Sequence, residues 1–317
     1  MFSKTNKLIN KNQAISKIVV VLGPTASGKS DLAVKLARKF NGEIISADSR
    51  QVYKGMDVGT GKITEKEMRD IKHYLLDVVS PKRQFTVAQY RKLALEAIDK
   101  IYRKHKIPII CGGTGFYLQA VAEGLVIPRV KPDWKLRGEL EEKDTEELFK
   151  ELRKLDPRRA KNIDARNRRR LIRALEIIIK TGKPIPKLEI QPRFNVLMLG
   201  IKKSPQELKK LIHQRLLKRL GRGMISEVQK LKKLGVSWRR FDDFGLEYRY
   251  VAKYLQGELT KQEMIDKLQK EIEHYAKRQM TWFSAHGGPA SGGKRTSIHW
   301  IDNYKQAEKL VKEFLKR

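Results

Sequence analysis

The first third of the chain alternates short apolar runs with segments that have helical periodicity. Residues 17–22, KIVVVL, are rich in β-branched side chains, as is typical of a buried strand. The strands predicted in this part are 17–22, 43–47, 73–79 and the run that follows Pro108. Helices are predicted over 29–40, and from the capping-box sequence TVAQ at 86–89 to about residue 105. Strands that alternate with helices indicate a parallel sheet with right-handed crossovers.

The pattern changes after Gly124. Residues 131–182 carry only helical signals and end at Gly182, which suits a helix C-cap, before one more strand is predicted at 194–201. A helical block between two strands of one sheet indicates an insertion. The expected divisions are a first part of the core at 17–124, a helical insertion domain at 125–190, and the rest of the core with C-terminal helices at 191–317.

Three polar segments in the last third of the chain predict two helix starts and one loop. The sequences SPQE at 204–207 and TKQE at 260–263 match capping boxes, and each of them opens a basic helix. Residues 287–297, GGPASGGKRTS, predict a flexible, exposed loop.

The charge balance points to a polyanionic partner. The chain of 317 residues has 69 lysines and arginines against 36 aspartates and glutamates, a formal net charge of +33. This excess indicates nucleic acid or an anionic membrane, unless it reflects an organism with a generally lysine-rich proteome. No window reaches membrane-spanning length, and the polar N-terminus lacks the apolar stretch of a secretory signal. We therefore expect a cytoplasmic protein that binds nucleic acid rather than a membrane.

The cysteine and histidine content excludes two kinds of site. The single cysteine, Cys111, cannot form a disulfide within the chain. The six histidines are scattered, and no cluster with Cys111 has the spacing of zinc ligands.

The segment after the first strand, GPTASGKS, fits the phosphate-binding pattern G-x-x-x-x-G-K-[ST] in its required strand–loop–helix context. Its glycines let backbone amides point at phosphate oxygens, and the helix N-terminus adds partial positive charge. Lys29 would reach the terminal phosphate, and Ser30 could hold Mg²⁺. The predicted phosphate-binding residues are Gly23, Pro24, Thr25, Ala26, Ser27, Gly28, Lys29 and Ser30. From the loop alone, the default ligand is ATP or GTP.

The loop and the strand pattern together define the expected fold class. This class is α/β, with a P-loop NTPase-like parallel sheet flanked by helices and an all-helical insertion domain. Two further segments fall at the carboxyl ends of predicted strands, where open α/β sheets place their ligands. Asp48, in ISADSRQVY, is compatible there with a magnesium ligand, a general base or a helix cap. GGTG, at 112–115, allows a ligand to approach closely.

Two basic segments are candidates for contacts with nucleic acid. In the insertion, a helix with an apolar stripe carries four arginines on its other faces: Arg166, Arg169, Arg170 and Arg173. The segment 277–284, KRQMTWFS, interleaves basic and aromatic residues, which suits phosphate contact combined with base stacking. These residues are Lys277, Arg278, Trp282 and Phe283. The alternatives are a solvated charged face for the arginines and packing into the core for Trp282.

Taken together, these segments resemble the tRNA dimethylallyltransferase family, also called tRNA isopentenyltransferases. The shared motifs are GPTASGKS, ISADSRQVY with GMDVGTGK, GGTGFYLQA, N-x-x-R-x-x-R-A-L-E at 167–176, GLEYRY and KRQMTWF. In that family the loop holds the diphosphate of dimethylallyl diphosphate, and the prenyl group passes to N6 of adenosine 37 of tRNA, beside the anticodon. The resemblance thus implies a prenyltransferase, assisted by Mg²⁺ and expected to be a monomer, with tRNA and dimethylallyl diphosphate as substrates.

The resemblance also implies roles for single residues. Asp48 aligns with the catalytic aspartate that takes the N6 proton, Lys29 stabilises the leaving diphosphate, and Arg215 looks like an arginine near that group. The residues expected to contact tRNA are Asp48, Ser49, Arg50, Gln51, Thr114, Arg137, Asn167, Arg170, Arg173, Arg249, Lys277, Arg278, Gln279 and Trp282. The chain departs from the family at Ser284, where arginine is common.

Three other functions stay open from the sequence. A prenyltransferase acting on free AMP would share the P-loop and Asp48, but it would not need an arginine-rich insertion. A P-loop kinase or an ATP-driven nucleic-acid motor calls for a Walker B carboxylate and a base-binding lid, and the sequence offers no convincing version of either. A noncatalytic RNA-binding module would have no need of Lys29 and Asp48.

Overall fold

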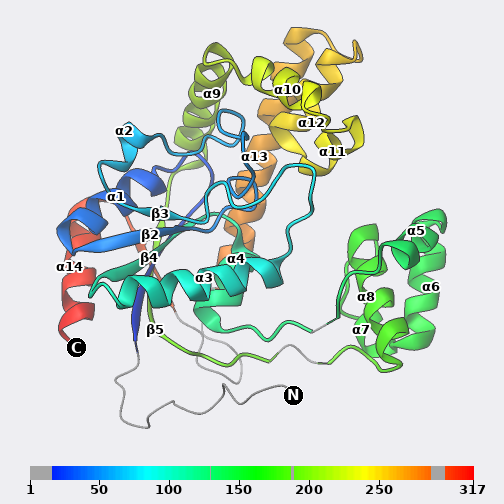
Figure 1. Cartoon of the computed structure of the whole chain (residues 1–317), viewed down its shortest axis with the longest axis horizontal. Helices are drawn as coiled ribbons and strands as arrows, with labels where there is room; N and C mark the ends of the chain where they lie inside the picture. Colours follow the sequence, from blue (N-terminus) through cyan, green and yellow to red (C-terminus); the bar gives the residue numbers. More distant parts are fainter. Residues whose placement is uncertain (1–15, 129, 187–188, 287–296) are drawn as a thin grey trace. The chain divides into compact units, whose positions relative to one another are not determined.

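The computed structural model describes residues 16–128, 130–186, 189–286 and 297–317 (Figure 1). The chain divides into two compact units, one formed by 1–124 with 191–317 and the other by 125–190. The two divisions fall where the hydrophobic pattern changes from strands to helices and back again.

The first unit is built on a six-stranded parallel sheet with the strand order β3-β2-β4-β1-β5-β6. Its strands are β1 (Lys17–Leu22), β2 (Gly42–Ser46), β3 (His73–Tyr74), β4 (Ile107–Gly112), β5 (Asn195–Ile201) and β6 (Ile298–Ile301). The predicted parallel α/β sheet is thus confirmed. Because every strand runs in the same direction, all the carboxyl ends lie along one edge of the sheet.

The central strand β1 is buried on both of its faces. Ile18, Val20 and Leu22 belong to one apolar core, whereas Val19 and Val21 belong to the core on the other side. A strand between two cores needs no polar face, which explains the continuous apolar run KIVVVL. The helices that contribute to the first core include α3 (Val87–Tyr102) and α4 (Gly115–Leu118), and those of the second are α1 (Lys29–Lys39) and α14 (Tyr304–Lys316).

A third apolar cluster of the first unit joins its C-terminal helices to the segment 52–56. These helices are α9 (Pro205–Gly221), α10 (Met224–Lys233), α11 (Trp238–Phe244), α12 (Leu246–Leu255) and α13 (Lys261–His286). The short helix α2 (Glu65–Met68) and a π-helical turn (Gln119–Glu123) complete the unit.

The second unit is helical, as the sequence predicted for the insertion. Its helices are α5 (Trp134–Glu142), α6 (Thr145–Leu155), α7 (Pro157–Ala160) and α8 (Arg168–Thr181), which ends at Gly182 in the left-handed conformation. They share one apolar core, to which α8 contributes Leu171, Ala174 and Leu175. Across the described residues of both units, no helix is long and apolar enough to cross a membrane.

Two strands differ from the sequence prediction. Strand β3 has only two residues instead of the predicted 73–79, because Leu75 and Asp77 take left-handed backbone angles that end the pairing. Strand β6 was missed, since its four residues, IHWI, are too few for a clear period. The predicted loop at 287–297 lies outside the described residues except for Ser297.

The capping boxes have different outcomes. The boxes at Thr86 and Thr260 are confirmed, because hydrogen bonds run both ways between each threonine and its partner three residues later. Ser204 caps α9 as predicted, but Glu207 binds Lys203 at 2.6 Å instead of closing the box.

Candidate active site

Three loops of the first unit meet at the carboxyl edge of its sheet. Since β2, β4 and β1 are neighbours, residues 47–51, residues 113–115 and the P-loop at 23–30 lie side by side. The amide of Ser49 donates a hydrogen bond of 3.0 Å to Oγ1 of Thr114, which joins the first two loops. The sheet therefore brings together segments that lie far apart in the sequence.

Gln279 of α13 fixes the P-loop to the glycine-rich turn after β4. Its Oε1 accepts from the amide of Thr25 at 2.8 Å, and its Nε2 donates to the carbonyl of Gly113 at 2.9 Å. Gln279 is buried, and a side chain at position 113 would overlap its amide group. The long helix α13 thus contributes to the position of the phosphate-binding loop.

The P-loop has the conformation of an anion-binding turn. Gly23, Ala26 and Gly28 have φ values of 150°, 63° and 89°, and residues with such left-handed angles are typical of turns whose amides bind anions. The hydroxyl of Ser27 is buried and has no hydrogen-bond partner among the described residues. A phosphate oxygen would give this hydroxyl a partner, so the loop fits a phosphate ligand.

The side chain of Lys29 is held against the backbone of the P-loop. Its Nζ donates to the carbonyl of Pro24 at 2.6 Å. Its pKa is lowered to about 8, mainly because burial disfavours the charged ammonium group, and nearby Arg215 acts in the same direction. The pKa of Lys29 also responds to Asp48, which raises it and so opposes this effect. Lys29, Arg215 and Asp48 therefore lie within electrostatic reach of one another.

Asp48 has one oxygen fixed and one available. Oδ1 accepts from the amides of Arg50 and Gln51 at 2.8 and 3.3 Å, which orients the carboxylate. Oδ2 has no hydrogen-bond partner within the described ranges, so it can accept one from a substrate. The residues that follow form a turn, so the interpretation as a helix cap is wrong. The described residues contain no cluster of three or more carboxylate, histidine or cysteine side chains that could hold a metal.

Arg215 and Arg219 of α9 lie against the backbone of the 57–62 loop. Arg215 donates to the carbonyl of Gly61 at 3.2 Å. Arg219 donates to the carbonyls of Gly59 and Thr60 at 3.1 and 3.2 Å. A side chain at position 61 would overlap both guanidinium groups, which explains the glycine in GTGK. The loop therefore orients the two arginines.

Glu227 holds the same loop from the other side. Its carboxylate accepts hydrogen bonds of 2.7, 2.7 and 2.9 Å from the consecutive amides of Asp57, Val58 and Gly59. Tyr248 donates its hydroxyl proton to Oε1 of Glu227 at 2.8 Å. Four hydrogen bonds thus converge on one carboxylate and fix the backbone on which Arg215 and Arg219 lie.

Comparison with known proteins identifies the family. The sequence matches the profile of the IPP transferase family over residues 51–286. The chain belongs to this family. It is 40% identical over 309 residues to the tRNA dimethylallyltransferase of Acetivibrio thermocellus, across 94% of this chain and 96% of that protein. Among solved structures, the tRNA isopentenylpyrophosphate transferase of Bacillus halodurans matches with a TM-score of 0.68 and 34% identity, over 96% of both chains. A eukaryotic dimethylallyltransferase acting on tRNA matches with a TM-score of 0.76 and 27% identity, over 94% of this chain and 77% of that one.

In this IPP transferase, several residues predicted to contact tRNA also have contacts within the first unit. Arg50 donates to the carbonyl of Phe244 at 2.8 Å and lies over its ring. Gln51 donates to the carbonyl of Gly61 at 3.4 Å. Their contact with tRNA stays a prediction, and their side chains already support the walls of the site.

The basic and aromatic residues of α13 separate into two groups. Lys277 and Arg278 are exposed, with Arg278 over the ring of Tyr275. Trp282 packs against the apolar core to which α4 contributes. A side chain at position 115, the first residue of α4, would overlap the indole ring of Trp282. The geometry favours core packing for Trp282, and the contact of Lys277 and Arg278 with nucleic acid stays a prediction. Arg249, on α12, forms an ion pair of 2.6 Å with Asp242.

In the second unit, two arginines that were predicted to contact tRNA pair with the same buried carboxylate, that of Glu176. Arg137 binds Glu176 at 2.7 Å, and Arg173 also pairs with it. Asn167 caps α8 by accepting from the amide of Arg170 at 3.1 Å. Of these arginines, Arg170 is exposed, whereas Arg137 and Arg173 are partly buried against Glu176.

Sequence reasoning missed Arg219, Glu227, Glu247 and Tyr248. Arg219 follows Arg215 by one helical turn and pairs with Glu247 at 2.7 Å. The spacing of the two arginines was a usable signal, and Glu247 and Tyr248 lie inside the motif GLEYRY. Glu227 gave no local signal, since its partners are about 170 residues away along the chain.

Proposed function

We propose that the protein transfers a dimethylallyl group from dimethylallyl diphosphate to N6 of adenosine 37 in tRNA. The observation that supports this proposal is that the loops carrying Lys29 and Asp48 lie at the same edge of the sheet, and that Arg215 binds the Gly61 carbonyl that Gln51 also contacts, in a chain of the IPP transferase family. The three groups supply what the reaction needs, two cations for a leaving diphosphate and one carboxylate for a proton. We further propose that the protein acts as a monomer in the cytoplasm, where tRNA is modified.

The phosphate side of the site would bind and stabilise the leaving group. Backbone amides of the P-loop, the Ser27 hydroxyl and the Lys29 ammonium would bind the diphosphate, together with Arg215. As the bond between C1 of the dimethylallyl group and the diphosphate oxygen breaks, negative charge grows on that oxygen. Fixed donors stabilise it without first having to reorganise.

A magnesium ion would fit this arrangement as a partner of the diphosphate. Ser30, exposed at the start of α1, offers a hydroxyl oxygen, and Mg²⁺ is commonly held by few protein groups together with substrate phosphates. When bound, it would neutralise charge on the diphosphate. The lack of a carboxylate cluster in the described residues agrees with a metal that arrives with its substrate.

Asp48 would act on the nucleic-acid side. The N6 amine of adenosine is a weak nucleophile because its lone pair is delocalised into the ring. A hydrogen bond from N6 to the available Oδ2 of Asp48 would orient the amine. Oδ2 would then receive the N6 proton as N6 bonds to C1. The products are the prenylated adenosine, diphosphate and the proton held by Asp48. The base must first leave the anticodon stack, at a cost of a few kcal/mol.

One experiment separates this function from the alternatives. Purified protein would be incubated with unmodified tRNA, free AMP, dimethylallyl diphosphate and Mg²⁺, and the nucleosides analysed by mass spectrometry. We expect N6-isopentenyladenosine in tRNA at position 37 and none formed from AMP. Product on AMP alone would support the free-nucleotide prenyltransferase. In a parallel incubation with ATP, robust tRNA-stimulated ATP hydrolysis without prenyl transfer would support the motor.

A further inference from the structure

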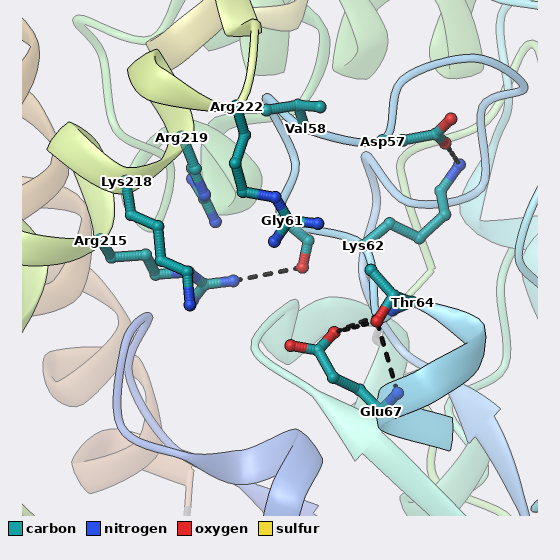
Figure 2. Close-up of a pocket in the computed structure, with 10 residues that line it drawn as sticks. All are labelled: Asp57, Val58, Gly61, Lys62, Thr64, Glu67, Arg215, Lys218, Arg219 and Arg222. Carbon is teal, nitrogen blue, oxygen red and sulfur yellow. Dashed lines mark hydrogen bonds and ion pairs between the residues drawn. The ribbon is translucent and has the colours of Figure 1, made fainter. Parts of the chain in front are cut away.

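A cavity of about 300 Å³ lies between α9, the 57–64 loop and α2 (Figure 2). Four cationic residues line it from one side: Arg215, Lys218 and Arg219 of α9, and Arg222 at its C-cap. Their spacing places them on one face of the helix. Figure 2 shows all four side chains projecting toward the loop, with Glu67 across the cavity. We call these four residues the α9 basic face.

The positive charge of the α9 basic face is only partly compensated. Arg219 pairs with Glu247 at 2.7 Å. Lys218 and Arg222, by contrast, have neither a hydrogen-bond nor an ion-pair partner for their side chains in the described part of the chain. Two carboxylates also line the cavity: Asp57 pairs with Lys62, and Glu67 is bonded to Thr64 in a capping box. Because the cations around the cavity outnumber these carboxylates, they repel one another, and an anionic ligand would stabilise the arrangement.

Two arginines at the inner end of the cavity, Arg215 and Arg219, are held in place by the backbone. Arg219 is 8% exposed, and its Nε has no hydrogen-bond partner in the described residues. Backbone carbonyls at 59–61 hold Arg219 and Arg215 in place, and Glu227 fixes that backbone in turn. Guanidinium groups that are held in place in this way are suited to charge-assisted hydrogen bonds with phosphate oxygens.

We propose that this cavity is a second anion subsite, which receives a diphosphate group on its way to or from the P-loop, with Lys218 and Arg222 holding it there. The inference rests on the proposed function for the identity of the anion. Arg215 links the two sites, because it lines the cavity and also lies within electrostatic reach of Lys29 and Asp48. The volume is at the lower end for small-molecule pockets, so it suits a diphosphate better than the phosphates of a folded RNA.

The test compares two double variants of the same helix. Lys218→Ala with Arg222→Ala removes two cations from the α9 basic face, whereas Lys209→Ala with Lys210→Ala removes two exposed cations elsewhere on α9. Calorimetry would measure the binding of inorganic diphosphate with Mg²⁺ in the absence of tRNA. We expect the first variant to bind at least about tenfold more weakly, from the loss of charge-assisted hydrogen bonds, and the control to bind like the wild type.

Two further measurements decide what the cavity serves. Thermal melts would show that both variants are folded, and titration of an anticodon stem-loop would report tRNA binding. Unchanged diphosphate affinity in the folded Lys218→Ala, Arg222→Ala variant would overturn the proposal. Weakened tRNA binding with unchanged diphosphate affinity would assign these cations to RNA and equally overturn it. Because the calorimetry needs no prenyl transfer, the subsite can be judged even if the wild-type protein transfers no prenyl group.

Discussion

Arg137 donates two hydrogen bonds to Glu176, from Nε to Oε1 at 2.9 Å and from Nη2 to Oε2 at 2.7 Å. Glu176 is fully buried, and its carboxylate also accepts from Arg173 and from the amide of Asp133. The core of the helical insertion thus contains a carboxylate whose charge is balanced by two arginines. Because Arg137 forms this buried pair, its substitution should lower the stability of the insertion, and the next variants measure that effect.

We expect Arg137→Ala to destabilise the insertion strongly, because it leaves a buried carboxylate without its bidentate partner. Breaking a buried pair costs about 3–5 kcal/mol, and the remaining Arg173 should keep the loss near the lower value. Urea unfolding would measure it. Arg170→Ala is the matched control, since this arginine is exposed and its loss should stay within about 0.5 kcal/mol. Equal stabilities of the two variants would contradict a structural role for Arg137.

Glu176 also predicts a pH dependence of stability. Burial alone would raise its pKa, but hydrogen bonds from Arg137, the Asp133 amide and Arg173 hold the pKa below the usual 4.5. Because the folded pKa is lower than the unfolded one, the stabilisation is present above pH 4.5 and is lost as the pH falls through the folded value.

The Glu176→Gln variant measures this contribution. The stability difference between the wild type and the variant should be largest near neutral pH and should shrink below pH 4.5, the unperturbed value for glutamate. Unfolding curves at several pH values would follow it. A difference that is constant across this range would show that the charge of Glu176 does not matter.

The roles of some site residues could be predicted from the sequence, whereas the buried contacts of others could not. Lys29 and Asp48 follow directly from a motif and from the ends of strands, because the parallel sheet fixes where such segments meet. Arg137 carried no sign of Glu176, because a buried partner on another helix leaves no local pattern, whereas Arg173 lies three residues before Glu176 on the same helix. Likewise, strand β6 forms by pairing with β5, as in Met198 with Ile298, and the four residues of β6 alone do not indicate this long-range pairing. Sequence patterns predicted the elements, whereas long-range polar contacts required the structure.

Glu227 should matter for catalysis although it lies outside the reacting groups. Glu227→Ala would free three backbone amides of the 57–59 segment and so loosen the loop that orients Arg215. We expect kcat/KM for dimethylallyl diphosphate to fall at least about tenfold, with tRNA affinity unchanged. Tyr248→Phe, which removes one hydrogen bond to the same carboxylate, should cause a smaller loss. The proposed positioning role fails if a folded Glu227→Ala variant retains wild-type kinetics.

Lys29 predicts an alkaline limit of activity. Its pKa of about 8 means that the ammonium loses its proton as the pH rises through that value, and with it the charge that attracts the diphosphate. The profile of kcat/KM for dimethylallyl diphosphate should therefore decline above about pH 8. Lys29→Arg would keep the charge and should move this decline to higher pH, even if its overall activity is lower. A profile that is the same in both proteins would assign the limit to another group.

Asp48 is proposed to take the proton from N6, and the single-turnover rate of prenyl transfer for Asp48→Asn tests this role. The amide keeps the shape of the side chain but cannot accept the proton. General bases typically contribute about 10²–10⁴-fold, so we expect the rate at saturating tRNA and dimethylallyl diphosphate to fall by at least about 100-fold, with tRNA affinity nearly intact. A folded variant that transfers the prenyl group within about threefold of the wild-type rate, well below that range, would contradict the account.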